Sequence, residues 1–300
     1  MTETIARWAL LLSLCLAAGG AIALAPAGDE LRARFAAVRE QGKGKIVDRS
    51  VYLLSTESAD RMQGDVYAVV DRPFDNLRQV LARAEDWCDI LILHINTQYC
   101  RVSRSAAKVE LLAGVGRKYD QPLADVYWLR FDYRVVSAAE AYLEVALKAP
   151  SGPLSTGDYR LFVEAAPLAQ NQSLLHLRYS YAYGLAGRWA MQAYLATVAR
   201  DKVGFTVIGQ HIDGQPIYVG GVRGVLERNT MRYYLGVETV LAAAEQLPAS
   251  SRPSQSLRDW FGATERYPLQ LHEIDSDTYF QMKLRQLHRQ QTELPPATAN

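Results

Sequence analysis

Hydrophobic and polar residues alternate with a period of two over much of the chain between residues 108 and 183. In the clearest stretch, Val126–Val136, aromatic and aliphatic side chains occupy every odd position, whereas Arg130, Asp132 and Arg134 lie between them. This alternation, interrupted by clusters of Gly, Pro, Asn and Asp, predicts an antiparallel sheet with one apolar face and one face in water. The stretches that share it are Lys108–Leu112, Val126–Val136, Tyr142–Leu147, Tyr159–Ala165 and Leu174–Tyr183.

A different period predicts helices on both sides of this segment. In residues 29–41, Leu31, Phe35 and Val38 are spaced so that they share one side of a helix. Val222–Gln246 is the longest predicted helix, and an apolar sheet face needs such an element to cover it. Further helices are predicted at 72–83, Glu85–His94, Ala186–Arg200, near Leu257–Phe261 and at 277–290, and further strands at Ser50–Ser55, Asp65–Val70 and Ile95–Val102.

The domain order follows from these elements and the segments between them. Residues 203–220 are a predicted hairpin insertion, because Asp213-Gly214 is typical of tight hairpin turns. Residues 248–256 are rich in Ser and Pro and predict a linker. We therefore expect a leader at 1–27, an α+β domain at 28–247, and an extension at 248–300 that consists of the linker, helices and a disordered tail.

The composition is that of a globular protein, with 49% hydrophobic and 22% charged residues in 300. The chain has 33 Lys and Arg against 32 Asp and Glu, so it lacks the basic excess that binding of nucleic acid normally requires. We therefore expect no nucleic-acid partner.

The first 27 residues have the pattern of an export signal. Arg7 precedes an apolar run over 8–18 that is too short to span a bilayer, and Ala25-Pro-Ala27 fits a signal-peptidase site. This pattern predicts an exported protein, periplasmic or secreted, with a retained N-terminal membrane anchor as the alternative. Lipid attachment at Cys15 is less favoured, because Leu14 stands where a small residue is expected.

Cleavage of this leader would leave two cysteines, Cys88 and Cys100. An even pair in an oxidising compartment predicts a disulfide. His94 lies between them without a second metal-ligating residue at suitable spacing, so we expect neither a metal nor another cofactor.

The order of elements resembles the helix-grip fold of the START-related lipid-transfer proteins and polyketide aromatase/cyclases (the SRPBCC superfamily). The segments that carry the resemblance are Asp71-Arg-Pro-Phe, Trp87-Cys-Asp-Ile-Leu and Glu227-Arg-Asn-Thr-Met-Arg-Tyr-Tyr, within residues 50–246. The resemblance implies a curved antiparallel sheet wrapped around a long C-terminal helix, with a cavity between them. It also implies a hydrophobic small molecule (a lipid, a sterol or an aromatic compound) as partner, and it leaves transient contact with a membrane open. It implies no oligomeric state.

The residues expected to line this cavity come from the apolar faces of the strands and from the long helix. Tyrosines dominate the set, and each buried hydroxyl needs a hydrogen-bond partner that a polar-ended ligand or water could provide. The predicted ligand-binding residues are Tyr127, Leu129, Phe131, Tyr133, Tyr159, Leu161, Tyr179, Tyr181 and Tyr233. The alternation places His176 and Arg178 on the opposite face.

No complete catalytic set is present in the sequence, so we expect a binding protein. Two alternatives stay open: an enzyme of the cyclase, dehydratase or hydrolase type that uses the same cavity, and a structural or interaction protein with a filled core. Arg228 and Arg232 share a helix face and could bind an anionic headgroup, although an ion-paired face is the more ordinary interpretation. Gly220-Gly-Val-Arg-Gly224 fits a tight turn better than a phosphate-binding loop, and His272-Glu-Ile-Asp-Ser-Asp277 fits a helix N-cap better than a metal site.

Overall fold

The computed structural model describes residues 26–42, 44–46, 50–184 and 202–296. The predicted signal peptide, except for its last two residues, and the predicted helix at 186–200 lie outside the described residues. Within the described part of the chain, no helix combines the length and the hydropathy needed to cross a bilayer.

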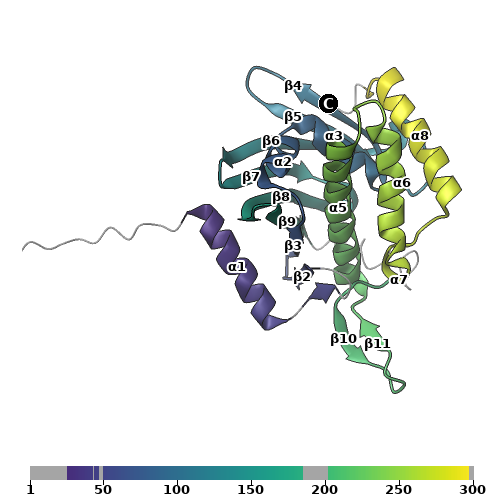
Figure 1. Ribbon diagram of the computed structural model, residues 1–300. Coiled ribbons are helices and arrows are strands. Elements are labelled where there is room, and N and C mark those ends of the chain that lie inside the picture. Colours follow the sequence, from purple (N-terminus) through teal and green to yellow (C-terminus); the bar gives the residue numbers. More distant parts are fainter. Residues whose placement is uncertain (1–25, 43, 47–49, 185–201, 297–300) are drawn as a thin grey trace, which may run out of the picture.

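One nine-stranded antiparallel sheet forms the body of the protein (Figure 1). Its strand order is β1-β2-β3-β9-β8-β7-β6-β5-β4. Strand β3 therefore pairs with the last strand, β9, and β4 forms the edge of the sheet opposite β1. The strands are β1 (Lys45–Ile46), β2 (Val51–Glu57), β3 (Arg61–Val70), β4 (Thr97–Arg104), β5 (Val109–Val115), β6 (Tyr127–Ala139), β7 (Tyr142–Ser151), β8 (Thr156–Ala169) and β9 (Gln172–Tyr183).

Helix α5 (Gly221–Gln246) covers the inner face of this sheet, beside β2 and β3. Gly64 on β3 permits the close approach, because a Cβ atom there would lie 3.1 Å from the Thr230 Cβ and would overlap its hydroxyl. Helices α2 (Phe74–Leu81) and α3 (Ala84–Leu93) pack on the same face. A sheet that curves around one long helix is the helix-grip arrangement, which confirms the predicted α+β fold.

The predicted disulfide between Cys88 and Cys100 is also confirmed. It joins α3 to β4, with 5.3 Å between the two Cα atoms. The bridge therefore fixes a covering helix to the edge of the sheet that it covers.

Helix α1 (Ala27–Gln41) packs on the outer face of the sheet, opposite α5. The side chains of Leu31, Phe35 and Val38 are buried there, as the predicted helical stripe requires. They meet residues of β2, β3, β7, β8 and β9, namely Tyr52, Tyr67, Tyr142, Ala166 and Leu174. The expectation that the outer face is in water is wrong for this region, because α1 covers it.

A buried polar network, centred on His176, lies on this covered part of the outer face. The ring of His176 has no exposed surface, and its nitrogens lie 2.8 Å from carboxylate oxygens of Asp65 and Glu164. Glu164 also accepts hydrogen bonds from Tyr142, at 2.5 Å, and from Arg34 of α1, at 2.6 Å. Burial opposes the charge of Glu164, but the hydrogen bonds from these three partners outweigh it and lower the pKa of Glu164 to about 2.

The C-terminal extension packs against the domain as three helices, α6 (Arg252–Glu265), α7 (Pro268–Leu271) and α8 (Ser276–Thr292). Helix α6 begins inside the segment predicted as a linker. Helix α8 lies along the edge strand β4, where the Gln290 side chain accepts a hydrogen bond from the backbone N–H of Cys100 at 2.6 Å. The ammonium group of Lys283, which is fully buried, donates to the carbonyls of His94 and Thr97 at 2.7 and 2.8 Å.

Candidate functional site

Four of the predicted ligand-binding tyrosines meet between the inner face of the sheet and α5, and we call them the tyrosine cluster: Tyr159 from β8, Tyr179 and Tyr181 from β9, and Tyr233 from α5. Ring centroids lie 5.4 Å apart for Tyr159 and Tyr181 and 5.1 Å apart for Tyr179 and Tyr233. Alternate residues of a strand point to the same face, which is why Tyr179 and Tyr181 both reach this space. The cluster thus joins the sheet to the long helix.

The hydroxyl groups of the tyrosine cluster are only partly satisfied by the protein. The Tyr159 hydroxyl lies 2.7 Å from the Thr156 hydroxyl. Among the described residues, none forms a hydrogen bond with the hydroxyls of Tyr179, Tyr181 or Tyr233. Tyr233 is partly buried, and burial strongly raises the pKa of its hydroxyl.

His94 closes one end of the cluster, with its ring 5.1 Å from that of Tyr233. Its Nδ1 accepts a hydrogen bond from the backbone N–H of Asn96, so Nε2 carries the proton and donates to Asn229 at 3.3 Å. Burial, reinforced by the cations Arg232 and Lys283, lowers the pKa of His94 to about 3. The ring is therefore neutral and both of its nitrogens have protein partners, so the hydrogen-bonding groups that the cluster presents are the uncharged tyrosine hydroxyls.

The other predicted ligand-binding residues lie at different distances from this cluster. Leu129, Phe131 and Leu161 are buried in the same apolar core. Tyr133 is separate, because its hydroxyl lies 3.4 Å from the Leu81 carbonyl on α2. Tyr127, at the start of β6, is 38% exposed. Burial raises the pKa of Tyr159 to about 12, and the phenol of Tyr127 adds to this shift.

Arg228 and Arg232, which could have bound an external headgroup, instead form ion pairs with Glu273 of the C-terminal extension. Both guanidinium groups and the carboxylate are buried, and Lys118 and Lys202 pair with the same carboxylate. Burial opposes the charge of Glu273, but Arg232 and Arg228 lower its pKa to about 2. The sequence did not reveal this ion-pair cluster, because Glu273 lies more than 40 residues beyond the arginines.

The residues that follow Glu273 form the beginning of α8. Asp275 caps α8, since its carboxylate accepts a hydrogen bond from the Thr278 N–H at 2.9 Å, as the sequence predicts. No group of three potential metal-ligating side chains comes together in the described part of the chain.

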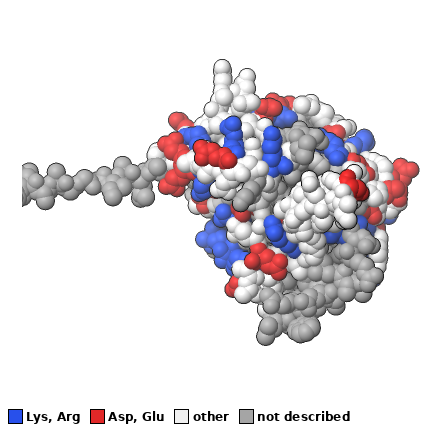
Figure 2. All heavy atoms as spheres, turned by 90° about the horizontal axis from the view of Figure 1, so that it is seen from below, with Lys and Arg blue, Asp and Glu red and all other residues white. Residues whose placement is uncertain are grey.

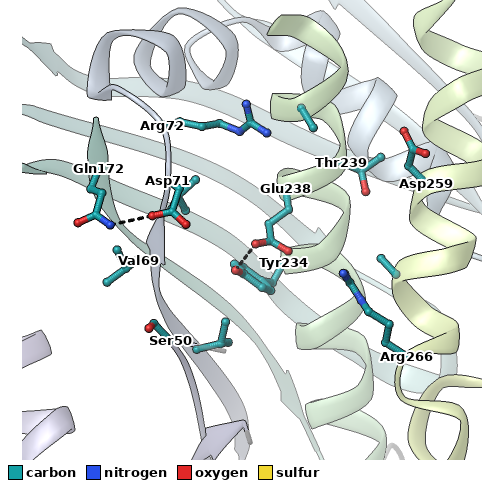
Figure 3. A pocket seen from close by; sticks show the side chains of 14 residues that line it. Ser50, Val69, Asp71, Arg72, Gln172, Tyr234, Glu238, Thr239, Asp259 and Arg266 are labelled. Carbon is teal, nitrogen blue, oxygen red and sulfur yellow. Dashed lines mark hydrogen bonds between the residues drawn. The ribbon is translucent and has the colours of Figure 1, made fainter. Parts of the chain in front are cut away.

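A separate trough of about 700 Å³ lies between the end of β3, α5 and α6 (Figure 3). Asp71, Asp259 and Arg266 stand at its rim and are exposed. The more enclosed Glu238 accepts a hydrogen bond from the Tyr234 hydroxyl at 2.6 Å. The trough has the size of a ligand site. However, the charged groups at its rim are exposed to water, and the carboxylate of Glu238 already accepts a hydrogen bond from Tyr234. The trough therefore shows no preference for a class of ligand.

Comparison with known proteins finds no family model and no curated protein that match this chain. Among solved structures, the Zhui aromatase/cyclase from a Streptomyces species aligns with 62% of this chain and 94% of its own, at 13% identity and a TM-score of 0.36. Human StAR-related lipid transfer protein 5 aligns with 73% of this chain and 99% of its own, at 8% identity and a TM-score of 0.35.

Truncated norcoclaurine synthase from Thalictrum flavum aligns with 48% of this chain and 87% of its own, at 10% identity and a TM-score of 0.34. The first two of these three structures carry the names of the two classes that the sequence resembles. Since all three TM-scores are below 0.5, the helix-grip fold described above rests on strand order and packing and not on these neighbours.

Proposed function

We propose that this protein binds a hydrophobic small molecule with at least one polar group between the inner face of the sheet and α5, without transforming it. The observation that carries the proposal is the tyrosine cluster, in which the hydroxyls of Tyr179, Tyr181 and Tyr233 have no hydrogen-bond partner among the described residues. A lipid, a sterol or an aromatic compound has the required chemistry.

The energetics favour a ligand at this position. None of these three hydroxyl oxygens is among the fully enclosed, unpartnered polar atoms of the described residues, so each still reaches accessible space, where a ligand oxygen can replace water as its hydrogen-bond partner. The aromatic rings provide flat apolar walls for the remainder of the ligand. Because Tyr159, Tyr179, Tyr181, Tyr233 and His94 are all neutral, the site favours an uncharged polar group such as a hydroxyl or a carbonyl.

We further propose that the protein works outside the cytoplasm. The signal-like pattern of residues 1–27 supports export, and the Cys88–Cys100 disulfide is typical of proteins in oxidising compartments.

An enzyme that used this site would gain no charged polarising group from Arg178 or His176. Arg178 lies on the outer face of the sheet, where its guanidinium donates to Asp65 at 2.8 Å. His176 lies in the same outer network. Neither side chain faces the tyrosine cluster, so catalysis there would depend on tyrosine hydroxyls and the neutral His94 alone.

Native mass spectrometry of the mature protein, with organic extraction, tests the proposal directly. We expect a bound apolar molecule, or saturable binding of a fluorescent fatty acid or sterol. Tyr181→Phe and Tyr179→Phe should each weaken that binding about 2–10-fold, the worth of one hydrogen bond. The matched control is Tyr183→Phe on the same strand, because the Tyr183 hydroxyl already donates to the Ser58 carbonyl at 2.9 Å. A protein that carries no molecule and binds none of these probes would contradict the proposal and favour the filled-core alternative.

A further inference from the structure

The hairpin of β10 (Val207–Gln210) and β11 (Pro216–Tyr218) extends from the body of the protein at the end where α5 begins (Figure 1). Its aliphatic side chains are unusually exposed, with Val207 at 52%, Ile208 at 60% and Ile212 completely exposed. Asp213 is the only formally charged residue from position 203 to 220, where the chain's 22% average would place about four. Figure 2 views this end of the molecule. The tip is therefore apolar, poor in charge and in contact with water.

The base of the hairpin is firmly held although its tip projects. The buried carboxylate of Glu227 on α5 accepts hydrogen bonds from the backbone N–H groups of Phe205 and Thr206 at 2.7 and 2.9 Å. The ring of Phe205 packs edge-on against Tyr267, with 5.4 Å between centroids. A two-stranded hairpin alone is only marginally stable in water. These contacts therefore fix the orientation of the tip relative to α5.

The turn itself directs its polar groups inward and its apolar side chain outward. The Asp213 carboxylate accepts a hydrogen bond from the Gln215 N–H at 3.0 Å, and the His211 N–H donates to the Gln215 carbonyl at 2.8 Å. Gly214 adopts a φ of 83°, a conformation that favours glycine. Ile212, next to this closed turn, is left fully exposed.

We propose that the hairpin tip docks the protein on a lipid bilayer by inserting Val207, Ile208 and Ile212 into its interfacial region. Exposed apolar groups of this kind mark interaction sites. A stable protein–protein interface needs about 800 Å² from each partner, far more than three side chains on a narrow projecting turn provide. A bilayer requires no complementary shape, and its interior disfavours charge, which matches the single carboxylate of the hairpin.

This docking goes beyond ligand binding and does not depend on it. Vesicle binding can be measured with protein that carries no ligand, so failure of one proposal leaves the other intact. If both hold, the hairpin brings the beginning of α5, and with it the ligand site, to the membrane that supplies or receives the ligand.

Co-sedimentation with phosphatidylcholine vesicles, with and without phosphatidylglycerol, tests the docking. We expect the mature protein to bind the vesicles. The double variant Ile208→Asp, Ile212→Asp should bind about 100-fold more weakly, because the burial of each isoleucine in the bilayer contributes about a tenfold increase in affinity. The matched control is Val136→Asp with Leu294→Asp, which changes two residues exposed at 56% and 74%, one on β6 and one beyond α8, both on elements apart from the hairpin (Figure 1). The control should bind within about twofold of the unmodified protein. Equal circular dichroism spectra verify that both variants fold.

Two outcomes would overturn the proposal. The first is a lack of vesicle binding by the unmodified protein, or equal binding by the hairpin variant. The second is a dimer, seen by light scattering without vesicles, that the hairpin substitutions abolish, since the tip would then contact a second copy of the chain.

Discussion

The two faces of the sheet differ in how they satisfy buried polar groups. On the outer face, the Tyr142 hydroxyl donates to Glu164 at 2.5 Å, with a Glu144 oxygen 3.0 Å away, and His176 lies between two carboxylates. On the inner face, Tyr179 and Tyr181 are also buried, but no described residue hydrogen-bonds to their hydroxyls. The outer network is thus complete within the protein, whereas the inner cluster leaves bonds for another molecule.

The two faces also differ in charge. The outer network contains the ionised side chains of Arg34, Asp65 and Glu164, and α1 shields them from water. The inner cluster contains only neutral groups. The comparison teaches that tyrosine enrichment alone does not mark a binding site, and that the presence or absence of protein partners for the hydroxyls separates a structural role from a binding role.

Removal of the central carboxylate should give the largest effect. Glu164→Gln leaves the partly buried Arg34 without its anion and leaves the buried His176 with Asp65 as its one carboxylate partner, so we expect the free energy of unfolding to fall by about 3–5 kcal/mol in urea titrations. The control Asp158→Asn breaks only exposed pairs with Arg160 and Arg61 and should cost less than about 1 kcal/mol. A loss equally small for Glu164→Gln would mean that the outer network is not what holds α1 to the sheet.

Acid should weaken the same network. The folded-state pKa of Glu164, about 2, lies below its ordinary value of 4.5, so its contribution is fully present above pH 4.5 and is lost as the pH falls through 2. We expect the stability to drop by roughly 3 kcal/mol over this window from Glu164 alone. The acid-dependent loss should be smaller by that amount in Glu164→Gln, which has no such group to protonate. An unchanged acid dependence in that variant would place the titrating carboxylate elsewhere, for example at Glu273.

The inner face can be tested through the contact between β3 and α5. Gly64→Ala introduces a methyl group that overlaps the Thr230 side chain, and we expect a loss of about 1–3 kcal/mol together with weaker ligand binding. Gly209→Ala on the hairpin is the control, because its added Cβ would lie 3.7 Å from the nearest atom. Full tolerance of Gly64→Ala would show that α5 is not held tightly against the inner face.

The smallest effects should differ between the two faces. Tyr142→Phe removes a satisfied hydroxyl and should destabilise the empty protein by about 1 kcal/mol, whereas Tyr181→Phe removes an unsatisfied one and should leave stability unchanged or higher. Thermal unfolding of both variants, with and without a bound probe, measures this difference. Equal losses at both positions would remove the distinction between the faces.

Much of the inner face could be predicted from sequence because period-two alternation is local. It correctly grouped Tyr159, Tyr179 and Tyr181 on one side and placed His176 on the other. The alternation could not separate Tyr133 and Tyr127 from the cluster. It predicts the face of the sheet on which a side chain lies, whereas the position along the strand decides which helix that side chain contacts.

The outer network and the Glu273 cluster were missed for a physical reason. Both depend on charged partners that are more than 40 residues apart, and no periodic signal reports such pairing. One signal was present, however. The stripe of Leu31, Phe35 and Val38 required an apolar partner, and Tyr67 and Leu174 supplied it on the face that was expected to be in water.

The contact between α8 and β4 has a consequence for how the protein is made. An edge strand with open hydrogen-bonding groups can pair with other chains, and here Lys283 and Gln290 of α8 bond to the backbone carbonyl of Thr97 and the backbone N–H of Cys100. Synthesis runs from the N-terminus, so the ribosome completes residues 97–104 long before it adds these two. For most of translation the nascent chain therefore carries this edge without α8, and a chain truncated before residue 283 would leave both backbone groups open.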